Sequence, residues 1–350
     1  MNNLIVKNVS FSYLENEKVL DDISFNLNSD DFLCVLGESG SGKTTLLKLI
    51  AGLLIPDEGS IIINEVNQNF VPAHKRKIGY VFQEPKLYTH LTVYENLMLG
   101  IKHIKLTFEE KDLLIKKLMK AFHLLSFMNI KPRYLSYGEQ EKVALAKVFL
   151  VQEDLYLFDE AMSGLDTLSK KRTLNYINKI KKENHAPMIY VSHDEENIPS
   201  FTTKVLIFKN GKILFFNTLD EMYNHPTHID ILHYSDEKYN YLPIKTISNK
   251  LYYENIFIND FSLPDGEYIL CLPTSNFYLV DKSDFILSVN KSYLDKNGNL
   301  ILDGIFLNCR ISILLPLEKE IDNKKKYLCF NFKVQKGFLF KKSGEYITSF

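Results

Sequence analysis

The chain has 350 residues, of which 45% are hydrophobic and 24% are charged. This is the composition of a globular protein, and the length suggests two domains. The formal net charge of −1 at pH 7 provides no electrostatic basis for binding nucleic acid, which would require a basic surface. We therefore predict no nucleic-acid partner.

The four cysteines indicate the redox state of the compartment, and the lengths of the apolar runs indicate whether the chain could span a membrane. The cysteines lie singly within apolar stretches and without C-x-x-C spacing, so we expect free thiols, as in a reducing cytosol, rather than disulfides or a metal site. The N-terminus lacks the apolar core of a signal peptide, and stretches such as 49–55 are far too short to span a bilayer. We expect no transmembrane segment, so separate membrane subunits would have to supply any transport pathway.

Two features near the N-terminus point to a nucleotide. Tyr13, in the stretch Phe11-Ser-Tyr13, could stack on a purine face. Residues 37–45 read GESGSGKTT and fit the pattern G-x-x-x-x-G-K-[ST], in which glycines let backbone N–H groups curl around phosphates. An apolar, strand-like run precedes this pattern at 32–36 and a helical pattern follows it, as a phosphate-binding P-loop requires.

The P-loop residues have distinct expected roles. Lys43 would bring its charge to the β- and γ-phosphates, and the Thr44 hydroxyl would bind Mg²⁺. The candidate nucleotide-binding residues of this segment are Gly37, Glu38, Ser39, Gly40, Ser41, Gly42, Lys43, Thr44 and Thr45.

Polar side chains follow three further strand-like runs. Gln83 follows one such run and could contact Mg²⁺ or the attacking water. The run 155–158 ends in Asp159-Glu160, where Asp159 would hold Mg²⁺, through water, and Glu160 would polarise the attacking water. His193, after the run 188–191, could bind the γ-phosphate and position that water. Alone, an apolar run ending in Asp-Glu is more often a strand end than a site; after a P-loop, the site is favoured.

The motifs together resemble the ATP-binding subunit of an ABC transporter over residues 1–232. The matching segments are 37–45 (Walker A), Gln83 (Q-loop), 135–139 (signature), 155–160 (Walker B), 163–166 (D-loop), His193 (H-loop) and Tyr13 (A-loop). The resemblance implies an α/β P-loop NTPase core with an inserted helical subdomain at about 84–154. It also implies ATP and Mg²⁺ as cofactors and a head-to-tail dimer of two copies. In that dimer Ser136, Gly138, Glu139 and Asp166 would face the ATP of the partner copy.

The signature reads LSYGE, where the family pattern is LSGGQ. Tyr137 replaces a glycine, so any left-handed backbone geometry there would now cost energy. Glu139 places a carboxylate in a site that collects phosphates, and at an effective dielectric near 20 two like charges ~8 Å apart repel by roughly 2 kcal/mol before screening. We expect weaker ATP-driven dimer closure than with glutamine at this position.

Between the Q-loop and the signature, helices are predicted. Residues 108–125 form an amphipathic pattern with an apolar stripe at Leu114, Leu118, Phe122 and Leu125, and Thr107 with Glu110 forms a capping box. That stripe is more typical of packing than of a partner surface. The segment 84–99 resembles the family segment that contacts the membrane permease; core packing is an equal alternative.

The rest of the chain changes character after Asn224-His-Pro226. Residues 170–184 predict an exposed helix, and Lys209-Asn-Gly-Lys212 predicts a hairpin. Residues 236–350 predict a small all-β, OB-like domain, with strands at 268–272, 277–280, 300–307, 311–317 and 327–334. Such a domain resembles those appended to importer ATPases for sugars, polyamines, ferric iron, oxyanions or sulfate, where it would serve dimerisation or regulation.

We therefore expect an ATP-hydrolysing subunit that powers a membrane ABC importer. It would be peripheral on the cytoplasmic face of the plasma membrane and would work with permease subunits and an extracytoplasmic solute-binding protein. The alternative is a non-transport or regulatory ABC ATPase whose altered signature has weakened turnover. The transported substrate is not encoded in this subunit.

Overall fold

The computed structural model describes residues 3–14, 17–192, 198–235, 237–254, 256–295, 297–315 and 327–350. It divides into two compact units, Met1–Leu219 and Asp220–Phe350. The boundary predicted from sequence was at 232–236. Leu232 belongs with the second unit because its side chain packs against Cys271, Phe338 and Phe340.

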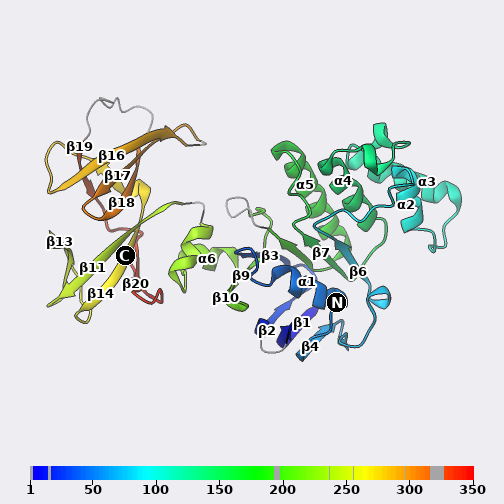
Figure 1. Ribbon diagram of the computed structural model, residues 1–350, viewed down its shortest axis with the longest axis horizontal. Helices are drawn as coiled ribbons and strands as arrows, with labels where there is room; N and C mark the ends of the chain where they lie inside the picture. Colours follow the sequence, from blue (N-terminus) through cyan, green and yellow to red (C-terminus); the bar gives the residue numbers. More distant parts are fainter. Residues whose placement is uncertain are drawn as a thin grey trace. The chain divides into compact units, whose positions relative to one another are not determined.

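The first unit contains two sheets (Figure 1). An antiparallel sheet has the order β2-β1-β4-β5, formed by β1 (Leu4–Ser12), β2 (Lys18–Leu27), β4 (Glu58–Ile63) and β5 (Val66–Asn67). The second sheet has the order β10-β9-β3-β8-β7-β6, formed by β3 (Phe32–Gly37), β6 (Ile78–Val81), β7 (Leu155–Asp159), β8 (Met188–Val191), β9 (Lys204–Lys209) and β10 (Lys212–Asn217). Its strands are parallel except for β10, which returns antiparallel to β9.

Helices and short turns lie between strands in both units. The helices are α1 (Lys43–Ala51), α2 (Val93–Gly100), α3 (Phe108–Ala121), α4 (Tyr137–Val148), α5 (Thr167–Asn184) and α6 (Leu219–Asn224). Short 3₁₀ turns lie at Ala73–Lys75, Leu125–Phe127, Pro132–Tyr134, Ile229–Tyr234 and Thr274–Asn276. Among the described helices, none is long and apolar enough to cross a membrane.

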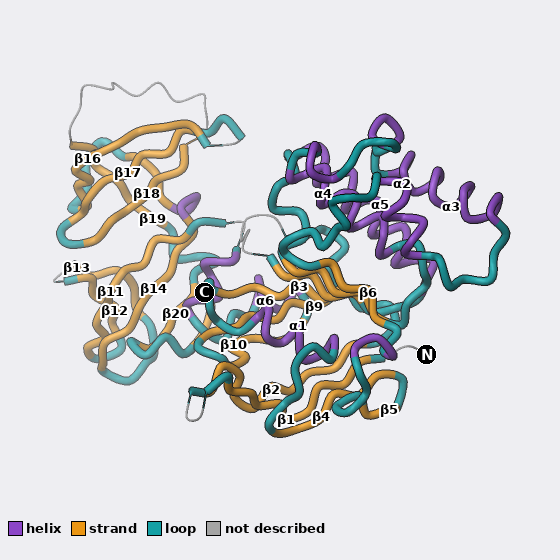
Figure 2. Tube along the Cα trace, turned by 45° about the vertical axis from the view of Figure 1, so that its right-hand side comes forward, coloured by secondary structure: helices purple, strands orange, loops and turns teal. Residues whose placement is uncertain are grey.

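The parallel sheet is covered on both faces, which explains why β3, β7 and β8 are buried along their whole length. On one face, α1 and the antiparallel sheet share a single apolar cluster with alternate residues of the parallel strands. On the other face, Phe149 after α4 packs against Tyr156 and Phe158, and Tyr176 of α5 packs against Phe149. Figure 2 shows this layering within the first unit.

Helix α3 begins where it was predicted to begin but ends earlier than predicted. Thr107 and Glu110 form the expected capping box at the start of α3. The helix ends at Ala121 rather than 125, because His123 adopts a left-handed φ of 56° that a helix cannot continue through. The predicted apolar stripe is therefore wrong at Leu125, which lies in a separate turn and is 45% exposed.

The predicted hairpin and free cysteines are confirmed. Asn210 and Gly211 have φ values of 50° and 73°, as a two-residue turn between β9 and β10 requires. The four cysteines are unpaired; Cys34 and Cys271 are buried, whereas Cys309 and Cys329 are half-buried.

The second unit is an antiparallel β domain, as predicted. One sheet has the order β13-β12-β11-β14-β20-β21, formed by β11 (Tyr239–Ile247), β12 (Lys250–Tyr253), β13 (Ile256–Asp260), β14 (Gly266–Pro273), β20 (Phe338–Lys341) and β21 (Tyr346–Ser349). The other has the order β15-β19-β16-β17-β18, formed by β15 (Phe277–Leu279), β16 (Phe285–Leu294), β17 (Leu300–Phe306), β18 (Cys309–Leu315) and β19 (Tyr327–Phe332). Phe285, Phe306 and Phe330 lie at the centre of its core, with ring centroids 5.3–5.6 Å apart.

Arg76 is expected to be a large contributor to the stability of the first unit. Arg76 is 7% exposed, and its guanidinium donates to the carbonyls of Leu49 and Ile50, at the end of α1, and to those of Gln68 and Val71. Arg76→Met should cost about 3 kcal/mol of unfolding free energy, because the carbonyls lose their donors inside the fold. Denaturant unfolding measures this, with the exposed Arg133→Met as the control. A loss no larger than that of the control would contradict this role.

Candidate nucleotide-binding site

The P-loop joins β3 to α1 through a backbone that needs glycine. Gly37, Gly40 and Gly42 have φ values of 145°, 81° and 109°, which side-chain-bearing residues rarely adopt. A Cβ at Gly40 would meet nothing within 4 Å, so this turn leaves open space next to its backbone. Gly42 starts α1 without a side-chain cap, so the first N–H groups of the helix have no side-chain acceptor there. The loop is therefore suited to an anion.

Two side chains of the loop, those of Lys43 and Ser41, are also suited to binding a phosphate. Lys43 is 6% exposed, and its ammonium donates to the carbonyls of Gly37 at 2.7 Å and Glu38 at 2.8 Å. Ser41 Oγ is buried and has no hydrogen-bond partner within the described part of the chain. A buried hydroxyl without a partner is costly, and a phosphate oxygen would satisfy it.

A carboxylate meets the P-loop at the end of β7. Asp159 is 2% exposed and accepts hydrogen bonds from Thr44 Oγ1 at 2.9 Å and from the Tyr80 hydroxyl at 3.0 Å. Burial raises the pKa of Asp159 above its usual value, although both hydrogen bonds act in the opposite direction. Within the described ranges, no three His, Cys, Asp or Glu side chains form a metal-binding cluster. Thr44 and Asp159 therefore fit Mg²⁺ if phosphate oxygens and waters complete its coordination.

The next residue brings a second carboxylate to the same sheet edge. Glu160 has a left-handed φ of 49°, and its N–H donates to Val191 O of the adjacent strand. Its Oε2 accepts a hydrogen bond of 3.1 Å from Gln83 Nε2, at the loop after β6. Residues far apart in sequence are thus together, as the ends of parallel strands predict.

Of the remaining predicted residues near the P-loop, Tyr13 is placed and His193 is not. Tyr13 is 55% exposed, its hydroxyl lies 3.3 Å from Thr45 Oγ1, and its ring meets Phe11 edge-on. His193 lies outside the described residues. Val191, two positions before it, pairs with Asp159 and Val35 at the same sheet edge.

The signature residues form the start of α4. Ser136 caps this helix, and its hydroxyl and N–H donate to Glu139 Oε2 at 2.8 and 2.7 Å. Tyr137 is the first helical residue and does not adopt a positive φ, so the backbone cost considered for this position does not arise. Asp166 caps α5 by accepting from Ser169 N at 3.0 Å, and hydrogen bonds from Ser169 lower the pKa of Asp166.

Sequence reasoning missed two polar residues of this region. Tyr80 contacts Asp159, as described above. Glu141 of α4 is 1% exposed and accepts from Ser163 Oγ at 3.1 Å and from Gly164 N at 3.1 Å, while burial raises its pKa. The available signal was a carboxylate one helical turn before the apolar residues Ala144 and Leu145 of α4.

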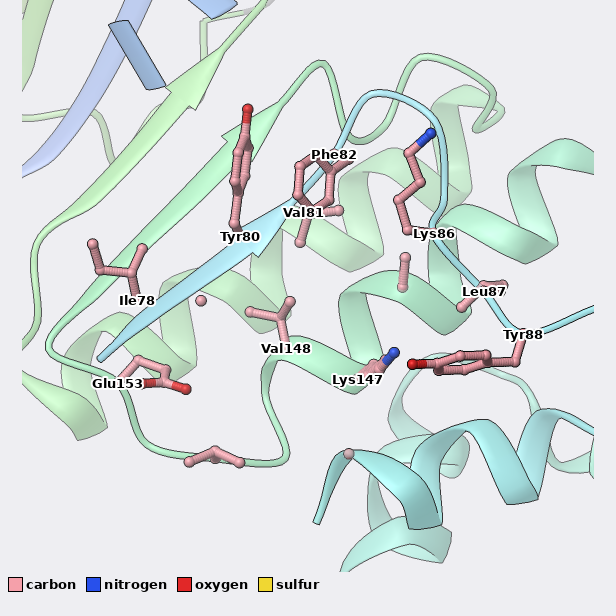
Figure 3. A pocket seen from close by; sticks show the side chains of 14 residues that line it. Ile78, Tyr80, Val81, Phe82, Lys86, Leu87, Tyr88, Lys147, Val148 and Glu153 are labelled. Carbon is pink, nitrogen blue, oxygen red and sulfur yellow. The ribbon is translucent and has the colours of Figure 1, made fainter. Parts of the chain in front are cut away.

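A cavity of about 600 Å³ lies beside this region, between β6, the segment after it and α4 (Figure 3). Its lining includes Tyr88, Lys147 and Glu153. The Lys147 ammonium lies 5.2 Å from the centroid of the Tyr88 ring. Burial lowers the pKa of Lys147. The pKa of Glu153 is raised to about 7, mainly by burial and to a lesser extent by the negative charge of the nearby Asp154. The cavity therefore carries a cation at one end and a carboxyl that titrates near neutral pH at the other.

Asp159→Asn should raise stability at neutral pH in the absence of metal. Because the pKa of Asp159 is raised in the fold, its contribution to stability is full below the ordinary carboxyl pKa and declines as the pH rises through the folded-state pKa. At pH 7 the ionised form therefore costs stability that the amide does not. The thermal unfolding midpoint measured in EDTA between pH 5 and 8 should be higher for the variant. A lower midpoint throughout that range would contradict the assignment.

Comparisons with known proteins agree with this geometry. The ABC transporter family profile matches residues 20–163. The chain is 34% identical over 223 residues to the molybdate/tungstate import ATP-binding protein WtpC of Pyrococcus abyssi, covering 64% of each chain. It is 35% identical over 226 residues to the sulfate/thiosulfate import ATP-binding protein CysA of Synechocystis sp., covering 64% of this chain and 62% of that one. The match thus spans just under two thirds of each relative.

Solved structures give the same result for the fold. A dimeric ATP-binding cassette in a post-hydrolysis state bound to ADP and Pi aligns with a TM-score of 0.58 at 28% identity, covering 62% of this chain and 98% of that one. An ATP-binding subunit of an ABC transporter aligns with a TM-score of 0.56 at 29% identity, covering 63% and 91%. Residues 20–163 therefore match the ABC transporter family, and the fold of the chain over this region is that of an ATP-binding cassette.

Proposed function

We propose that this chain binds ATP with Mg²⁺ and hydrolyses it to drive import through a separate membrane permease. The observation that carries the proposal is the meeting of two polar pairs at one sheet edge: Thr44 with Asp159, and Gln83 with Glu160. The first pair supplies metal ligands next to a phosphate-binding loop, and the second supplies a base and an amide to position water.

In this proposal the residues of the site divide the work of binding and hydrolysing ATP. The N–H groups of the loop from Gly37 to Gly42, together with Lys43 and Ser41, hold the phosphates, while Tyr13 stacks on the base. Thr44 and Asp159 hold Mg²⁺, which would neutralise charge on the phosphates. Glu160 takes the proton of the attacking water. The other proposed participants are Glu38, Ser39, Gly40, Thr45, Gln83, as a water or Mg²⁺ contact, and His193, at the γ-phosphate.

A second copy of the chain would complete the site. Ser136, Gly138, Glu139 and Asp166 would face the nucleotide of the partner copy, and the dimeric cassette among the structural relatives supports this arrangement. The Glu139 carboxylate already occupies the hydroxyl and N–H of Ser136. It therefore adds negative charge where a phosphate would approach, which supports weakened closure and keeps a regulatory ATPase with slow turnover as the second candidate.

The permease would dock at the segment 84–99 and the cavity beside it. Lys86, Leu87 and Tyr88 of that segment line the cavity. Docking there would be coupled to nucleotide binding because Gln83 directly precedes the segment and contacts Glu160. The chain would then be peripheral on the cytoplasmic face of the membrane and serve a system with an extracytoplasmic solute-binding protein, as importer relatives suggest. The second unit would support dimerisation or regulation.

Glu160→Gln tests the central role in this mechanism. The wild type should hydrolyse ATP in a Mg²⁺-dependent manner. The variant should bind ATP and lose at least about 100-fold in kcat, because the amide cannot accept the water proton. It should also accumulate an ATP-bound dimer in size-exclusion chromatography. Lys43→Ala is the control that should lose ATP affinity and turnover together. An unchanged kcat in Glu160→Gln would refute the assignment.

Glu139→Gln tests the altered signature. The amide retains an oxygen that can cap the helix, so stability should change little. Removing the charge should lower the KM for ATP several-fold, in line with relief of roughly 1 kcal/mol of screened repulsion. Steady-state kinetics at low and high salt measure this, and the difference should shrink at high salt. If the variant and the wild type have the same KM for ATP at low salt as well as at high salt, the repulsion is excluded.

A further inference from the structure

Tyr137 occupies a position from which one side chain reaches two functional loops. Its hydroxyl donates to the backbone carbonyl of Gln83, in the loop after β6. Its ring covers Gly164, in the loop after β7: a Cβ added at Gly164 would lie 2.4 Å from Tyr137 Cδ1. The two contacts join α4 to both loops.

Gly138 and Glu141 of α4 also lie close to Gly164. A Cβ added at Gly138 would lie 2.6 Å from Gly164 O, so the backbones of the signature helix and the second loop are nearly in contact. The N–H of Gly164 also donates to the buried Glu141 carboxylate. Gly164 is therefore held between the Tyr137 ring, the Gly138 backbone and Glu141, all from α4.

The contact to Gln83 has a direct consequence for chemistry. The side chain of Gln83 donates to Glu160 Oε2, while its own carbonyl is held by Tyr137. The position of the amide next to the proposed base therefore depends on a backbone that Tyr137 restrains. A glycine at position 137 could make neither the hydroxyl contact nor the ring contact.

We propose that Tyr137 is a positioning residue for ATP hydrolysis. Its hydroxyl fixes the Gln83 backbone and its ring fixes Gly164, so that the start of α4 and the two loops move as one body within a subunit. This inference rests on the proposed ATPase function. It gives the tyrosine a role that differs from simple filling of space, because the hydroxyl acts on turnover through Gln83.

Tyr137→Phe separates the two contacts, since it keeps the ring on Gly164 and removes the donor to Gln83. Loss of the hydrogen bonds of this hydroxyl, to Gln83 and with Ser163, should lower kcat roughly three- to ten-fold. The KM for ATP and the thermal unfolding midpoint should stay close to those of the wild type. Tyr134→Phe is the matched control: Tyr134 is exposed, lies three residues earlier and should show no change. An unchanged kcat in Tyr137→Phe would overturn the proposal.

A double-mutant cycle tests whether the effect runs through Gln83. In a Gln83→Ala background, Tyr137→Phe should have little further effect on kcat, because the amide that the backbone positions is gone. If the two losses instead add in full, Tyr137 acts by another route and the proposal is wrong.

Hydrogen exchange gives a readout that does not need activity. The amides of residues 82–84, 86 and 87 should exchange faster in Tyr137→Phe than in the wild type and in Tyr134→Phe. Unchanged exchange would overturn the proposal whatever the kinetics. A wild-type chain that hydrolyses no ATP would contradict the proposed function alone, while the exchange experiment would still decide whether Tyr137 restrains the loop.

Discussion

The hydrogen bond between the Thr44 hydroxyl and the Asp159 carboxylate joins the phosphate-binding loop to the end of β7, and the candidate site is arranged around it. It forms because parallel strands bring their carboxyl ends to one edge. Burial raises the pKa of Asp159, so the ionised group is held there at a cost in stability. A divalent cation would relieve that cost, which is the physical reason to expect metal and phosphate together at this edge.

Buried charges hold the surrounding loops by contacting backbone rather than opposite charges. Arg76 donates to carbonyls at the end of α1, and Glu141 accepts from Gly164 N. Each contact ties the backbone of one segment to a side chain from another part of the chain. Removing either partner would leave an unsatisfied group inside the fold. Tyr137 extends the same design from α4 to Gln83.

Local patterns carried the predictions that the structure confirms. The strand before the P-loop, the runs that became β7 and β8, the capping box of Thr107 and the turn at Asn210-Gly211 all depend on residues close in sequence. The contacts of Tyr80, Tyr137 and Glu141 were not predicted, because no sequence pattern indicates which distant segment each of these side chains reaches. The end of α3 was missed because the left-handed backbone at His123 overrides an amphipathic pattern that continues past it. The roles assigned to individual site residues stay predictions.

The central claim is that Thr44 and Asp159 form half of a metal site that operates only with a bound nucleotide. Calorimetric titration of ATP into the wild type and into Thr44→Val, each with Mg²⁺ and with EDTA, tests it most directly. The account predicts that Mg²⁺ tightens ATP binding to the wild type and has a much smaller effect in Thr44→Val, whose affinity in EDTA should match that of the wild type. An equal gain from Mg²⁺ in both proteins would contradict it.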